Sequence, residues 1–93
     1  MFQDHLIGEL SARLERLQSA AGTRVGDVTQ LRQQVETRPV SWLTVATSCA
    51  LALADELCWD SLARGDTRAF ERQATISADL RLFGLCTRLL DDD

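Results

Sequence analysis

Three acidic side chains stand inside the most apolar stretch of the sequence, CALALADELCWD, residues 49–60. Glu56 and Asp60 are four residues apart, so a helix places both carboxylates on one face. Paired carboxylates can serve as a general acid and base or hold a pair of metal ions. Helical di-metal sites also use a Glu-x-x-His motif, and the single histidine of the chain, His5, is not part of one.

Two other interpretations of these acids involve no chemistry. Arg64 lies one turn beyond Asp60 on the same face, where the two could form a surface ion pair that contributes little stability. Alternatively, Arg81 or Arg88 from another helix could pair with Glu56 inside a helix interface. Such a buried pair would fix the register of the helices more than it would stabilise them. The sequence leaves all three interpretations open.

The remaining reactive residue types are too scattered to form a recognisable site. Cys49 and Cys58 are nine residues apart and therefore lie on opposite faces of a helix. The sequence contains no zinc-type Cys/His cluster, P-loop, dinucleotide-binding motif or nucleophile elbow. We therefore expect no metal, no cofactor and no catalytic residue, with small buried thiols in a reducing cytoplasm and a solvated His5.

Composition indicates one small soluble domain over residues 1–93. Hydrophobic residues make up 45% of the chain and charged residues 26%, as in globular proteins. The net charge is −4 and the arginines alternate with acids, which argues against nucleic-acid binding. The longest apolar run, residues 42–54, is shorter than the roughly 20 residues of a membrane span, and no signal peptide is visible. The absence of lysine, asparagine and tyrosine suggests a GC-rich bacterial genome. We expect a bacterial cytoplasmic protein that binds neither nucleic acid nor membrane.

The apolar periodicity predicts helices and no strand. A stripe that recurs every three or four residues, from Leu6 to Ala21, predicts a first helix over residues 3–20. Gly22 and Gly26 favour a break after it, with Thr23 or Asp27 as the N-cap of a second helix. One continuous helix through residues 3–37 is the alternative.

Proline and glycine mark the later boundaries. Pro39 should end the second helix near residue 38 and suits the first turn of a third helix that runs to residue 64. Gly65 is the expected C-terminal stop and Asp66 the N-cap of a fourth helix over residues 67–90. The predicted fold is all-α, a small bundle of about four helices made of two antiparallel hairpins.

The third and fourth predicted helices are apolar over about 200° of their circumference, more than an isolated small bundle needs. Exposed apolar area of this extent usually marks an interface. We therefore expect an adaptor, co-chaperone or complex subunit that binds another protein or itself, most simply as a homodimer. One alternative is a compact monomer with the third helix at its centre. Another is a bundle with a ligand pocket or active site that uses Glu56, Asp60 and Cys49. The expected partner-binding residues are Trp42, Cys49, Leu53, Glu56, Trp59, Leu82, Phe83 and Leu89.

The stretch LARGDTRAFERQATISADLRLFGL, residues 62–85, resembles the second arm of the small helical-hairpin co-chaperones of type III secretion. Those proteins carry a glycine turn, then an aromatic residue, then a glutamine-rich helix. The likeness covers about a quarter of the chain, and the apolar third helix and the cysteines depart from that pattern. The resemblance illustrates a class of binding protein and assigns no family.

Overall fold

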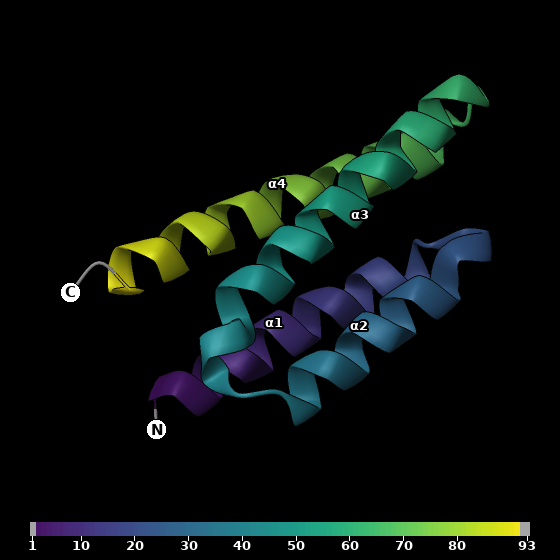
Figure 1. Cartoon of the computed structure of the whole chain (residues 1–93). Helices are drawn as coiled ribbons and strands as arrows, with labels where there is room; N and C mark the ends of the chain where they lie inside the picture. The colour runs from purple at the N-terminus through teal and green to yellow at the C-terminus, as the bar shows by residue number, and fades with distance from the viewer. Residues whose placement is uncertain (1, 92–93) are drawn as a thin grey trace.

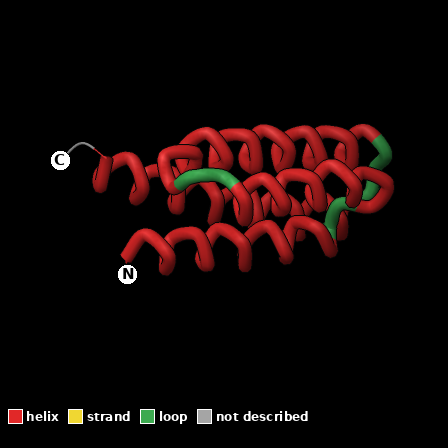
Figure 2. Tube along the Cα trace, turned by 60° about the horizontal axis from the view of Figure 1, so that its bottom comes forward, coloured by secondary structure: helices red, strands yellow, loops and turns green. Residues whose placement is uncertain are grey.

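The computed structural model describes the backbone of residues 2–91 and the side chains of residues 4–88 (Figure 1). Its four α-helices are α1 (Phe2–Ser19), α2 (Val25–Thr37), α3 (Leu43–Ala63) and α4 (Thr67–Asp91). Successive helices run in opposite directions, so that α1 and α2 form one hairpin and α3 and α4 another. Figure 2 shows both hairpin turns at one end and the α2–α3 connection at the other. No strand occurs within residues 2–91, and the all-α prediction is confirmed.

The first hairpin turns at the predicted break. Gly22 has a φ of +57°, in the left-handed region that glycine occupies without a Cβ clash. A 3-10 turn, Gly22–Arg24, then leads into α2. The predicted N-cap was wrong, because Arg24 occupies that position and no side chain caps the helix. Asp27 lies in the first turn of α2 instead, where it accepts a 3.0 Å hydrogen bond from Arg24 Nε.

The boundaries of α3 follow from proline and glycine. Arg38, before Pro39, has a ψ of 157° and ends α2, as predicted. A 3-10 turn, Val40–Trp42, precedes α3. At the other end, Gly65 has a φ of +71° and Asp66 N donates to Ser61 O across the turn, which is a Schellman motif. Asp66 Oδ1 accepts a 3.2 Å hydrogen bond from Ala69 N and so caps α4, as predicted.

The hydrophobic core lies where the two hairpins meet. All four helices contribute to it. Helix α3 packs against both α1 and α2, and its core residues are alanines and leucines. Several buried residues between α3 and α4 are small or polar, and the two helices approach closely at Gly84, where a Cβ would lie 3.4 Å from Thr47 Cγ2. The main buried side chains are Leu10, Leu14, Leu17, Val28, Leu31, Val35, Leu43, Ala46, Ala50, Leu53, Ala54, Leu57, Leu80 and Phe83.

One helical segment of the described chain, Val40–Ala63, is long and apolar enough to cross a membrane by length and composition. The expectation that no segment spans a membrane considered residues 42–54 alone and stays a prediction. One side of this segment, from Leu43 to Leu57, lies in the core between the hairpins. The core helix of a soluble protein meets the same criterion, so packing in this fold accounts for the apolar character of that side.

Candidate interaction surface

Two of the three acids of α3, Asp55 and Glu56, form ion pairs with arginines outside α3. Glu56 is exposed and accepts a hydrogen bond from Nη1 of Arg24, at the start of α2, so neither predicted partner on α4 contacts it. This ion pair raises the pKa of the Arg24 guanidinium. Asp55 accepts from Ser77 Oγ and lies 3.4 Å from Arg81 Nη2, both on α4. Arg64 lies 3.4 Å from Ser61 Oγ. Asp55 and Glu56 therefore link α3 to the neighbouring elements.

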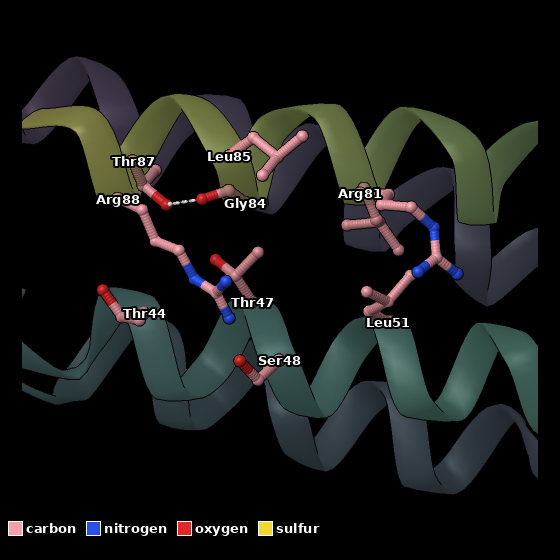
Figure 3. Close-up of a pocket in the computed structure, with 10 residues that line it drawn as sticks. Thr44, Thr47, Ser48, Leu51, Arg81, Gly84, Leu85, Thr87 and Arg88 are labelled. Carbon is pink, nitrogen blue, oxygen red and sulfur yellow. Dashed lines mark hydrogen bonds between the residues drawn. The ribbon is translucent and has the colours of Figure 1, made fainter.

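Two adjoining grooves run between α3 and α4. The first has a volume of about 290 Å³, and Figure 3 shows Arg88 reaching from α4 toward Thr47 and Ser48 of α3. The second has a volume of about 390 Å³. Arg81 lines both grooves and marks the boundary between them. Neither α1 nor α2 contributes a lining residue. The apolar lining residues are Leu51, Leu80 and Leu85 in the first groove, and Cys58, Trp59, Leu62, Phe70, Ala74 and Ala78 in the second.

Large apolar side chains around these grooves are exposed to solvent. Trp59 is 69% exposed and Leu62 53% exposed on α3. Leu82 and Leu85, on α4, are 65% and 52% exposed. Leu82 is one helical turn from both Ala78 and Leu85, so it continues the apolar surface beside the grooves. We name this surface, formed by the two grooves with Leu82, the outer face of the α3–α4 hairpin. Exposed apolar side chains grouped in this way are typical of an interaction site.

The predicted contact residues divide among several environments. Trp59 and Leu82 belong to the outer face. Leu53 and Phe83 are buried in the core, so a partner cannot reach them on this chain. The side chain of Leu89 lies outside the described residues.

The other three predicted residues lie away from the outer face. Trp42 packs against the core at the other end of α3, with Arg38 stacked 4.5 Å from its ring centroid. Cys49 is exposed but lines neither groove, and Glu56 is held by Arg24. The expectation of buried thiols was wrong for Cys49 and Cys86, which are both exposed.

Sequence reasoning missed Leu62 and Leu85 as members of the outer face. Each lies three residues beyond a residue that was singled out, Trp59 and Leu82 respectively. A spacing of three places two side chains on the same face of a helix. Helical spacing could therefore have found both residues, although it could not show which face of α3 the first hairpin covers.

The outer face carries few charges. Asp55 and Arg81 neutralise each other at its centre, and Arg88 adds one positive charge at one end. Cys58 is half-buried in the second groove, where burial and then the nearby Asp55 carboxylate raise the pKa of its thiol. No group of three metal-ligating side chains lies together among the described residues. The surface is suited to packing, and its chemistry offers no activated nucleophile.

Comparisons with other proteins yield no relative: no protein-family model, curated protein or solved structure matches the chain. Any functional conclusion therefore depends on the outer face itself.

Proposed function

We propose that this chain is a small, non-enzymatic, cytoplasmic protein-interaction module whose outer face packs against another protein surface. The exposure of Trp59, Leu62, Leu82 and Leu85 beside two continuous grooves is the observation that carries this proposal. Exposed tryptophan and leucine side chains grouped on one face, with few charges among them, are the composition expected of an interface.

The packing of the first hairpin supports this choice of surface. One side of α3 and α4 already lies against α1 and α2, so the outer face is the remaining broad apolar side of the second hairpin. The exposed acids Glu56 and Asp60 line neither groove, which keeps like charges out of the contact. The three free cysteines fit a reducing compartment.

A photo-activatable residue placed on the outer face tests this proposal in cells. We expect the residue to form covalent adducts with a polypeptide when it replaces Leu82. The control replaces Val25, an exposed apolar residue on α2, and should give no such adduct. Adding Leu62→Arg should abolish the adduct at position 82, because it places a charge in the contact. Equal labelling at positions 82 and 25, or a small apolar molecule retained in the groove under native mass spectrometry, would contradict the proposal.

A further inference from the structure

We infer that the occupant of the outer face is a second copy of this chain, an inference that rests on the proposed function. The two copies are related by a two-fold axis that runs parallel to α3 and α4. In this arrangement α3 of each copy lies over α4 of the other, and the two hairpins form a second, intermolecular four-helix bundle. A two-fold interface uses the same surface on both copies, so the face must be complementary to itself.

The outer face is large enough to form a dimer interface. A helix of 21 residues, such as α3, is about 31 Å long at about 1.5 Å per residue. Two helices packed about 9 Å apart present a face about 18 Å wide, or roughly 560 Å². Two such faces bury about 1,100 Å² together, which exceeds the roughly 1,000 Å² expected of a biological interface.

The charges of the outer face select the direction of the axis. Asp55 is on α3 and Arg81 is on α4. Asp55 Oδ2 lies 3.4 Å from Arg81 Nη2, so the ends of the two side chains lie at the same height along the hairpin. With the axis parallel to the helices, Asp55 of one copy faces Arg81 of the other, so opposite charges meet twice. With the axis perpendicular to the helices, α3 would cross its own copy, and two Asp55 carboxylates would meet at the centre. Like charges placed together across an interface cost several kcal/mol, so the parallel axis is favoured.

The apolar residues agree with this arrangement. The Ser61–Gln73 and Asp55–Ser77 hydrogen bonds fix the register of α3 against α4 within one chain. By that register, Trp59 and Leu62 lie at the height of the Phe70–Ala74 segment. In the dimer they therefore pack on that segment of the other copy. Aromatic residues seated in a groove of the partner are the usual anchors of an interface.

Sedimentation of the purified chain over a range of concentrations is the first measurement. We expect a dimer that dissociates on dilution. Asp55→Arg and Arg81→Asp, each alone, should raise the dissociation constant on the order of a hundredfold. Mixing the two variants should restore a mixed dimer, because each then supplies the charge that the other lacks. This restoration separates loss of contact from misfolding, and far-ultraviolet circular dichroism confirms that each variant is helical.

Disulfide trapping tests the axis. In a background of Cys49→Ser, Cys58→Ala and Cys86→Ser, one copy carries Leu62→Cys and a differently tagged copy carries a second cysteine. We expect a mixed disulfide when the second site is Ala74→Cys. A mixed disulfide with Ser48→Cys instead would show the perpendicular axis and overturn the proposed arrangement.

Three outcomes separate this inference from the proposed function. A chain that stays monomeric, yet forms photo-adducts with a different protein through position 82, refutes the homodimer and leaves the proposed function intact. A dimer that none of the charge variants affects associates through another surface and refutes the inference. A monomer that forms no photo-adduct at position 82 refutes both.

Discussion

Gln73 on α4 donates a 2.9 Å hydrogen bond from Nε2 to the backbone carbonyl of Ala20, 53 residues earlier, just after the end of α1. The last carbonyls of a helix have no partner within the helix, so a side chain or water must satisfy them. The same amide accepts a 2.6 Å hydrogen bond from Ser61 Oγ of α3 through its Oε1 atom. One buried side chain therefore joins α1, α3 and α4 at the end of the bundle that holds both hairpin turns.

Replacing Gln73 by alanine should destabilise the fold by about 2–4 kcal/mol, because it leaves the Ala20 carbonyl and the Ser61 hydroxyl buried without this partner. Urea unfolding followed by circular dichroism measures the loss. Gln33, an exposed glutamine on α2, provides the control, since Gln33→Ala should change stability by less than about 0.5 kcal/mol. Similar losses for the two variants would show that the buried amide does not link the hairpins.

Replacing two of the glycines by alanine should change the stability of the fold in opposite directions. Gly65 has a φ of +71°, where a Cβ clashes with the backbone, so Gly65→Ala should cost about 1–2 kcal/mol. Gly8 lies within α1, and an alanine Cβ at this position would meet nothing within 4 Å, so Gly8→Ala should stabilise the fold by about 0.5–1 kcal/mol. Thermal unfolding of the two variants beside the parent tests the pair. A stabilising Gly65→Ala would contradict the left-handed turn between α3 and α4.

The elements of this fold could be predicted because their determinants are local. The spacing of Leu10, Leu14 and Leu17 defines the buried stripe of α1, and each of these residues is fully buried. Pro39 and Gly65 restrict the backbone wherever they occur, so they marked two helix ends correctly.

The site was harder to predict because it depends on which side of α3 the first hairpin covers. Leu53 and Trp59 are both apolar residues of one helix, yet the first is in the core and the second is 69% exposed. Glu56 pairs with Arg24, 32 residues away, through the tertiary packing of α2 on α3. Helical periodicity gives the direction of a side chain and carries no information on which neighbour it meets.

The pairing of Glu9 with Arg13 predicts a pH dependence of stability. Arg13 Nη1 donates a 2.8 Å hydrogen bond to Glu9 Oε2, which lowers the pKa of Glu9 from its ordinary value of 4.5. A lowered carboxyl pKa stabilises the fold above the unfolded value, and this contribution disappears as the pH falls through the folded value. The parent should therefore be more stable than Glu9→Gln near neutral pH, with a difference that vanishes in acid below the folded pKa.

Urea midpoints of the parent and Glu9→Gln, measured across that pH range, test whether the parent is the more stable protein near neutral pH. Glu36→Gln is the matched control, because Glu36 is exposed on α2 and forms no ion pair with the described residues. The urea midpoint of Glu36→Gln should differ little from that of the parent at every pH. A stability difference for Glu9→Gln that is the same at neutral and acid pH would rule out the Arg13 contact as its cause.

The three thiols should react at different rates with a disulfide reagent. Cys49 and Cys86 are exposed, whereas Cys58 is half-buried, and burial followed by the charge of Asp55 raises the pKa of its thiol. Because the thiolate is the reacting form, Cys58 should react several-fold more slowly than the other two in the folded chain. Single-cysteine variants followed with a chromogenic disulfide reagent give the three rates, and all three should converge in denaturant. Asp55→Asn should accelerate Cys58 alone, since it removes the nearby negative charge without opening the groove. Equal rates for Cys58 and Cys49 in the folded state would place Cys58 outside the groove and remove it from the outer face.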